Sequence, residues 1–454
     1  MNATSQDRSR RRLAVALFAA LFIVYNTNGR EVGTVDSQPA KFTAREVAVR
    51  GTLTLDRVVA ERPGLGERPA FARDRQGHVR SAYPMPSALM ASVPATLLHH
   101  SGLVNMEAPL APNLVAALTA SILTAAAVTF VFLAVARVVP QPVALLTALA
   151  IGLGTNYWAL VSRTLWQHET VAFGMGVTLW AWLRPVDQLR SRDLWLGGVG
   201  LALAGAARPQ VAPLVAVLLG WLAARSGARA ALAPTAVVTL AAALTIATNY
   251  YWFGHILGGA SRLEDVHPAT HGVEGSVSAT PWVGALGLLL SPSRGLLVFS
   301  PIVLTGLAAI QRTASTPAGL ALRWLTAGIV IQFAVYAAYS VWWGGHTYGP
   351  RYTLDLLVPM TPAIALGLAR LAKTDWGRGV AGVLLLWSIA VAAAGAFVYP
   401  NEAWNTNPAE VDRAHHRLWE IRDAQVFRIF RSAPSPQNFS LWDGPGVGFL
   451  GREP

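Results

Sequence analysis

The sequence contains no cysteine and few charged residues. Only 13% of its 454 residues are charged, whereas soluble domains carry roughly 25%. The absence of cysteine excludes disulfides and thiol chemistry. Residues 108–136, 230–261 and 324–350 contain no Asp, Glu, Lys or Arg, and each run reaches the roughly 20 residues that cross a bilayer. The composition therefore predicts a polytopic membrane protein and not a soluble domain behind a signal peptide.

Several sequence motifs are also missing. The chain has no Walker loop, no dinucleotide-binding glycine fingerprint and no nucleophile elbow, so it offers no sign of nucleotide chemistry. His99 and His100 have no spaced third ligand, and we expect no structural zinc site there. The net charge is +12, but the basic residues fall in short connectors, as a topology signal requires. We expect a lipid bilayer as partner and no nucleic acid.

The distribution of arginine sets the predicted orientation. Residues 8–12 hold four arginines directly before the apolar stretch 13–25, which places the N-terminus in the cytoplasm. A long polar loop, 26–112, then follows on the outer side, with a short helix expected over 43–55 and an interfacial helix ending near 98. Each connector predicted to lie inside is short and contains Lys or Arg.

The remaining apolar runs complete the predicted fold, an all-α integral membrane protein with about 11 transmembrane helices. Residues 1–400 form its membrane domain, and residues 401–454 form a short tail outside, with a helix expected over 408–430. The two runs that meet at Arg208-Pro209-Gln210 could instead form one broken hairpin. The ten spans expected after the first are 113–136, 142–161, 168–183, 194–207, 210–224, 230–251, 296–311, 324–341, 353–371 and 379–398.

Four polar clusters fall on the same, outer side in this topology. They are Asp36 after the first span, 163–169 between two spans, 291–297, and the aromatic and glycine-rich stretch 342–352. Ionisable groups gathered at one side of a membrane indicate a functional site. Arginine suits a phosphate group, because its planar fork pairs two anionic oxygens.

Each cluster also has a purely structural interpretation. Asp36 could be a solvated carboxylate or a helix cap, and His168 with Glu169 could cap the start of a helix. Arg294 and Arg351 could anchor the chain at lipid headgroups. Taken together, however, the clusters supply a carboxylate for general-base catalysis and cations for a departing phosphate.

These residues resemble the GT-C superfamily of polytopic glycosyltransferases, close to the branch of protein O-mannosyltransferases and aminoarabinose transferases. The resemblance runs from the first span to about residue 400. It implies a polyprenyl-phosphate sugar donor, inversion at the anomeric carbon, and an acidic base in the first outer loop, which Asp36 matches. Its marks besides Asp36 are Tyr83-Pro84-Met85-Pro86, Trp166-Gln167-His168, Ser293-Arg294-Gly295-Leu296-Leu297 and Tyr348-Gly349-Pro350-Arg351-Tyr352.

The sequence departs from that family in two respects. Asp36 is followed by Ser37, so the paired acids of protein O-mannosyltransferases are missing. No Asp-X-Asp motif lies on the second outer loop, where oligosaccharyltransferases carry metal ligands. No cofactor is therefore indicated with certainty, and a divalent metal remains an open alternative.

We expect a glycosyltransferase of a bacterial inner membrane, with its active site on the extracytoplasmic face. It would move one sugar from a polyprenyl-phosphate donor to a glycan, lipid or protein acceptor. Two alternatives remain: a non-catalytic flippase of lipid-linked glycans, and a glycan polymerase or ligase that uses pyrophosphate-linked donors. The expected roles are general base for Asp36; donor phosphate binding for Arg351, Arg294 and Arg163; and substrate binding for His168, Glu169, Trp342, Trp343, His346 and Tyr348.

Overall fold

The structure is a computed structural model, and it describes residues 3–265, 267–309, 317–443 and 445–447. Helices dominate these residues, as the composition predicts. The only strands in the described ranges are β1 (Phe71–Arg73) and β2 (Val79–Ser81), which form one antiparallel hairpin with Phe71 opposite Ser81.

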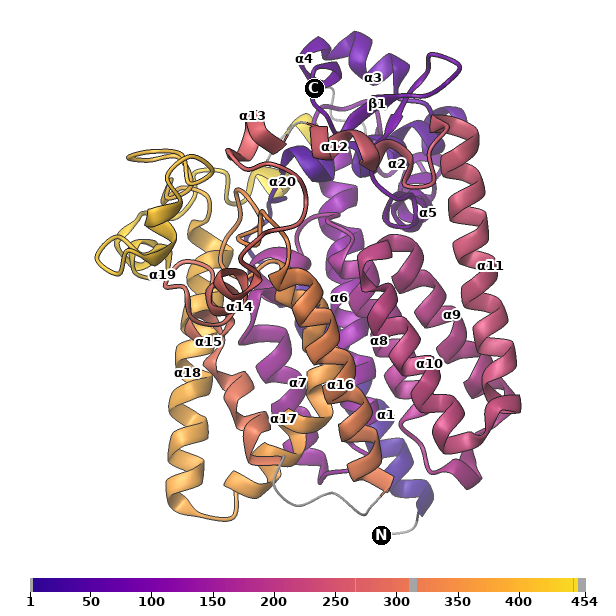
Figure 1. Ribbon diagram of the computed structural model, residues 1–454, viewed down its shortest axis with the longest axis vertical. Helices are drawn as coiled ribbons and strands as arrows, with labels where there is room; N and C mark the ends of the chain where they lie inside the picture. The colour runs from indigo at the N-terminus through magenta and orange to yellow at the C-terminus, as the bar shows by residue number, and fades with distance from the viewer. Residues whose placement is uncertain (1–2, 266, 310–316, 444, 448–454) are drawn as a thin grey trace.

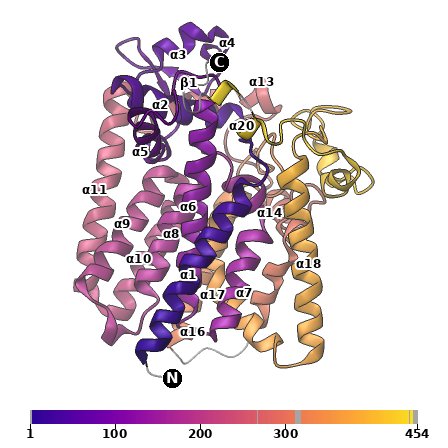
Figure 2. The same cartoon turned by 180° about the vertical axis from the view of Figure 1, so that it is seen from behind.

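The long helices run along one common direction and form a bundle (Figures 1 and 2). The N-terminus lies at one end of this bundle and the C-terminus at the other. The bundle contains α1 (Ala3–Asn26), α6 (Ala111–Val135), α7 (Gln141–Leu153), α8 (His168–Trp182), α9 (Ser191–Ala207), α10 (Ala212–Ser226), α11 (Ala228–Phe253), α16 (Pro317–Ala337), α17 (Leu357–Leu371) and α18 (Asp375–Val398).

Within the residues that the structure describes, six helical stretches are long and apolar enough to cross a bilayer, and each coincides with a predicted span. Among the other predicted spans, α7, α8 and α9 are helices of only 13, 15 and 17 residues. The six stretches are Ala111–Val135, Pro209–Ser226, Ala228–Phe253, Gly319–Ala337, Tyr352–Leu371 and Asp375–Val398.

The predicted span 296–311 is not one continuous α-helix. The chain forms α15 (Leu296–Phe299) and then the 3-10 helix η6 (Pro301–Ala309), and residues 310 and 311 lie outside the described ranges. Pro301 explains the break, because proline cannot donate the backbone hydrogen bond that an α-helix needs at this point.

Two other helix predictions differ from the structure. The helix expected over 43–55 is present, but it is shifted to α2 (Gln38–Arg50) and is capped by Gly51, whose φ of 64° is the left-handed conformation that favours glycine. The helix expected over 408–430 is mostly turns, with short helices such as η8 (His415–Trp419) and α19 (Gln425–Arg428). Val411, Leu418, Val426 and Ile429 of this segment are nevertheless buried, whereas Ile421 is exposed.

Small residues let the bundle helices approach closely. A side chain at Gly174 of α8 would lie 2.3 Å from the Gly200 carbonyl of α9, so the two backbones are nearly in contact. Such small-residue contacts are typical of helices that pack within a membrane. The principal core runs through α1, α6, α7, α8 and the later helices.

The end of the bundle at which the C-terminus lies carries most of the irregular segments, and these bring distant parts of the chain together (Figure 1). They include α2, α3 (Asp56–Glu61), α4 (Pro63–Gly66), the β-hairpin, α5 (Pro86–His100), α12 (Ser261–Asp265), α13 (His267–His271) and α20 (Ser440–Asp443). The short helix α14 (Pro281–Leu290) lies below them in Figure 1 and packs against α16.

Candidate active site

A cavity of about 1490 Å³ lies between these segments and the adjacent ends of the bundle helices. Single-ligand pockets measure about 300–1,000 Å³, so this cavity has room for more than one small ligand. One part of its wall is polar. Another part is apolar and consists of small or aliphatic side chains of α9, α10 and α11, among them Ala202, Ala206, Val215, Val238 and Ala242.

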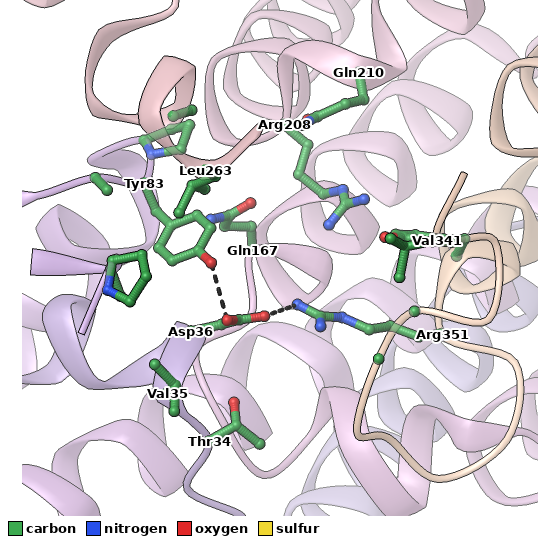
Figure 3. A pocket seen from close by; sticks show the side chains of 18 of the residues that line it. Thr34, Val35, Asp36, Tyr83, Gln167, Arg208, Gln210, Leu263, Val341 and Arg351 are labelled. Atoms are coloured by element: carbon green, nitrogen blue, oxygen red, sulfur yellow. Dashed lines mark hydrogen bonds and ion pairs between the residues drawn. The ribbon is translucent and has the colours of Figure 1, made fainter. Parts of the chain in front are cut away.

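Asp36 is the central carboxylate of the polar wall. It lies on η1 (Val35–Ser37), a single turn that leads into α2. Its Oδ2 lies 2.8 Å from Arg351 Nη2, and its Oδ1 accepts a hydrogen bond of 2.9 Å from the Tyr83 hydroxyl. Figure 3 shows Tyr83 and Arg351 reaching Asp36 from opposite sides.

The surroundings of Asp36 keep it ionised. Burial alone would raise the pKa of this carboxyl, but the ion pair with Arg351, the hydrogen bond from Tyr83 and the nearby His271 outweigh it. The pKa of Asp36 is therefore below its ordinary value. At neutral pH the cavity contains a carboxylate that can accept a proton.

Arg351 is positioned by a glycine-rich loop. Gly344, Gly345 and Gly349 have φ angles of 75°, 68° and 60°, which other residues adopt only with strain. Gly349 also packs so closely that a side chain there would lie 2.5 Å from the Phe299 ring. The loop presents the Arg351 guanidinium 4.4 Å from the centre of the Trp166 ring, where it makes a cation–π contact.

A second arginine, Arg208, lies at the same cavity, at the junction of α9 and η4 (Pro209–Val211). Its Nε lies 3.1 Å from Asp355 Oδ2, and its Nη1 lies 3.4 Å from His168 Nε2. Asp355 Oδ1 lies 2.7 Å from His168 Nδ1, and the hydroxyl of Tyr336 donates to Asp355 Oδ2. Arg208 is thus held at the cavity wall by a buried polar network.

A third polar group lies at the part of the cavity formed by α13, the glycine-rich loop and the C-terminal segment. Asp412 Oδ1 lies 3.1 Å from His271 Nδ1, and its Oδ2 lies 3.3 Å from His346 Nε2. The Trp343 indole donates to Asp412 Oδ1 at 2.7 Å. Burial raises the pKa of Asp412, but His271, Trp343 and His346 outweigh it, and the net pKa is below its ordinary value.

The structure brings some of the predicted site residues together and separates others. Asp36, Arg351 and His346 line the cavity. The remaining predicted residues lie behind its wall. His168 and Trp343 support lining residues, because they contact Arg208 and Asp412, respectively.

Two predicted phosphate-binding arginines have structural roles instead. Arg294 is fully buried, and all three of its guanidinium nitrogens donate to protein acceptors. Arg163 is also buried and donates to the carbonyl of Arg30. Neither lines the cavity, so the predicted contact of Arg294 and Arg163 with a donor phosphate does not fit this arrangement. The sequence could not reveal their burial.

Four predicted substrate-binding residues are likewise part of the packing. Glu169 is buried and accepts a hydrogen bond of 2.6 Å from Ser87 of α5. The Tyr348 hydroxyl donates to the Val391 carbonyl at 2.8 Å. Trp342 and Trp343 belong to a buried aromatic cluster. These side chains pack within the protein and do not line the cavity.

Four further residues line the cavity, namely Tyr83, Arg208, His271 and Asp412, and Asp355 lies behind Arg208; none of them was predicted as a site residue. Tyr83 stands out in the sequence only within the motif Tyr83-Pro84-Met85-Pro86, and His271 and Asp412 carry no local signal. Arg208 and Asp355, in contrast, do: both interrupt or flank long apolar helices, and an ionisable side chain at membrane depth indicates function.

Within the described ranges, no group of three or more His, Asp or Glu side chains is arranged to hold a metal ion. The sequence matches no protein-family model and none of the curated proteins with which it was compared.

Proposed function

We propose that the chain is a membrane glycosyltransferase of the GT-C type, with about 11 spans and its cavity on the extracytoplasmic face of a bacterial inner membrane. It moves one sugar from a polyprenyl-phosphate donor to an outer acceptor and inverts the anomeric carbon. One observation carries this proposal: a carboxylate ion-paired with an arginine lies in a large cavity that also has an apolar wall.

The cations of the cavity fit the donor phosphate. Arg351 and Arg208 both line the cavity and provide planar guanidinium groups. A phosphate whose negative charge grows as the glycosidic bond breaks is stabilised by such fixed cations. The apolar surface on α9, α10 and α11 suits the hydrocarbon chain next to that phosphate.

Asp36 takes the role of general base. Its ion pair with Arg351 keeps it ionised in the empty cavity. A donor phosphate that binds Arg351 competes with Asp36 for the same cation, so the carboxylate becomes more basic when the donor is present. In the transfer, the acceptor oxygen forms the new bond to the anomeric carbon, its proton goes to Asp36, and the carrier phosphate leaves with the electron pair.

The test compares wild type with Asp36→Asn in membranes that contain radiolabelled decaprenyl- or undecaprenyl-phosphate sugars. General-base catalysis typically contributes about 10²–10⁴-fold, so we expect transfer to fall by that factor while donor binding persists. The matched control is Asp187→Asn, which changes an exposed connector carboxylate far from the cavity.

Three outcomes would contradict the proposal. Equal transfer by wild type and Asp36→Asn would remove Asp36 as the base. Movement of labelled donor across the membrane without transfer, unaffected by Asp36→Asn, would favour a flippase. Turnover only with pyrophosphate-linked donors would favour a polymerase or ligase.

A further inference from the structure

The His271, Asp412 and His346 group lies at the same cavity as Asp36 and Arg351. These three side chains, here called the imidazole clamp, come from α13, the glycine-rich loop and the C-terminal segment. Asp412 is buried, with 8% of its side chain exposed, while His271 and His346 are 25% and 39% exposed. The carboxylate is the inner member of the clamp and the imidazoles are its outer members.

The clamp leaves one nitrogen of each imidazole free for a ligand. His271 faces Asp412 through Nδ1, and His346 faces it through Nε2. In the part of the chain that the structure describes, the opposite nitrogens, His271 Nε2 and His346 Nδ1, make no hydrogen bond. A neutral imidazole nitrogen donates or accepts, according to the tautomer that its partner fixes.

The carboxylate itself is held firmly. The Trp343 indole donates to Asp412 Oδ1, and the Asp412 carbonyl accepts from His415 Nε2 at 3.0 Å. His415 Nε2 also donates to the His271 carbonyl at 3.1 Å. Because the backbone carbonyls of His271 and Asp412 share one donor, these two residues are fixed in relation to each other.

The shared loop links the clamp to the proposed phosphate site. His346 and Arg351 are five positions apart on the glycine-rich loop, and Gly345 packs against His271, whose Cε1 would be 3.4 Å from a side chain at that position. The cavity volume exceeds what one sugar needs. A second ligand at the clamp would therefore share the cavity with the donor bound at Arg351.

We propose that His271 and His346, joined by Asp412, form the acceptor subsite of this cavity and bind the hydroxyl groups of a sugar or another polyol. This inference rests on the proposed transferase function. Each imidazole faces the Asp412 carboxylate with its N–H, so the opposite nitrogen carries a lone pair and accepts a hydrogen bond, which a sugar hydroxyl can donate. The clamp orients the acceptor, and Asp36 receives its proton.

Direct binding tests the subsite without any turnover. The purified full-length protein in nanodiscs is titrated with n-hexyl α-D-mannopyranoside and n-hexyl α-D-arabinofuranoside by saturation-transfer NMR. Their fully O-methylated forms control for binding through the hexyl chain. We expect the hydroxylated probes to bind, and His271→Asn and His346→Asn each to weaken binding about tenfold, the effect of one lost hydrogen bond.

The chain offers a matched control for these variants. His78 Nδ1 lies 2.8 Å from Asp56 Oδ2 in an exposed pair that does not line the cavity, and His78→Asn should bind the probes as wild type does. Asp412→Asn is a second test, but it also loosens the C-terminal segment. The two histidine variants keep the proposal testable if Asp412→Asn fails to fold.

The proposal is overturned if neither hydroxylated probe binds wild type, if the histidine variants bind as tightly as wild type, or if the O-methylated probes bind equally well. Its failure is distinct from that of the proposed function. If donor turnover depends on Asp36 but probe binding does not depend on the clamp, the transferase proposal stands and the acceptor subsite is rejected. Clamp-dependent binding without donor turnover would leave a polyol site and remove the transferase.

Discussion

Arg351 is held between Asp36 and Trp166, with its Nη2 2.8 Å from the carboxylate and its guanidinium 4.4 Å from the centre of the indole ring. A lysine could form the ion pair but not the planar stacking contact. The arrangement fixes the arginine in place before any ligand arrives. A preorganised cation of this kind stabilises developing charge without having to reorganise.

The pH dependence of turnover should report this ion pair. The pKa of Asp36 is lowered in the protein without donor, so kcat/KM, which reports the free enzyme, should fall only in strong acid, as pH drops through that lowered value. Tyr83→Phe removes a hydrogen bond to the charged form, which raises the pKa of Asp36 and moves the acid limb of the rate profile to higher pH. The measurement is donor turnover between pH 3 and 8.

The lowered pKa of Asp36 also makes the stability of the fold depend on pH. A carboxyl with a lowered pKa in the folded state stabilises the fold above its unfolded pKa, and this contribution disappears as pH falls through the folded value. Tyr83→Phe should therefore be less stable than wild type at neutral pH and should lose this difference in acid.

The rate profile has its own contradicting outcome. If the acid limb of the turnover profile stays at the same pH in Tyr83→Phe, Asp36 is not the titrating base.

Arg208 and Asp355 should depend on each other for stability. Arg208→Met leaves Asp355 buried without its cation, and breaking a buried pair in this way costs about 3–5 kcal/mol. Adding Asp355→Asn to Arg208→Met removes the uncompensated charge and should recover part of that loss. Thermal unfolding in detergent measures both effects.

The control for these two variants is Arg323→Met, because it replaces an exposed arginine and leaves no buried carboxylate without its cation. Its unfolding temperature should stay near that of wild type. If Arg208→Met and the double variant were equally unstable, the ion pair would not be the source of the loss.

The apolar pattern of the sequence predicts much of the bundle, because burial in lipid demands long runs without charge. It correctly places six helices that can cross a membrane. It fails where local chemistry overrides the pattern: Pro301 breaks an apolar run, and Gly51 caps at residue 50 a helix that was predicted to extend to residue 55. The total of about 11 spans stays a prediction, because six helices of the described residues have the length and apolar composition to cross a membrane.

The site was only partly predictable for a different reason. Asp36 and Arg351 stand out in the sequence, yet nothing local indicates that they form an ion pair. Arg294 stands out equally, but whether an arginine faces a cavity or the protein interior depends on segments more than 100 residues away, such as the one with Gln425. Long-range contacts, and not residue type, separate these two arginines.

Arg294 should hold the C-terminal segment onto the bundle. It donates to Gln425 Oε1 and Asn405 Oδ1, both at 2.6 Å, and to the Trp343 carbonyl at 3.0 Å. Arg294→Met leaves Asn405 Oδ1 and the Trp343 carbonyl without this donor, at roughly 1–3 kcal/mol for each, while Gln425 Oε1 keeps its hydrogen bond from the Gly349 backbone N–H. We expect the C-terminal segment to detach, with trypsin cleaving after Arg417 at lower concentration than in wild type.

Arg294→Lys should recover little, because a single ammonium cannot reach acceptors on three segments at once. Arg323→Met again serves as the control. An unchanged trypsin pattern in Arg294→Met would mean that the aromatic contacts of the segment suffice to hold it.

Two glycines in neighbouring helices should respond in opposite ways to the same substitution. At Gly367 of α17, an added Cβ would lie 1.8 Å from the Thr305 carbonyl of η6, so Gly367→Ala forces two backbones apart. Overpacking of this kind costs about 1–3 kcal/mol or more. At Gly379 of α18, nothing lies within 4 Å, and alanine there should be neutral or stabilise the helix by about 0.5–1 kcal/mol. Thermal unfolding of both variants in detergent measures these effects. If both variants unfold at the temperature of wild type, the backbones of η6 and α17 are not in close contact, and the irregular path after Pro301 does not depend on Gly367.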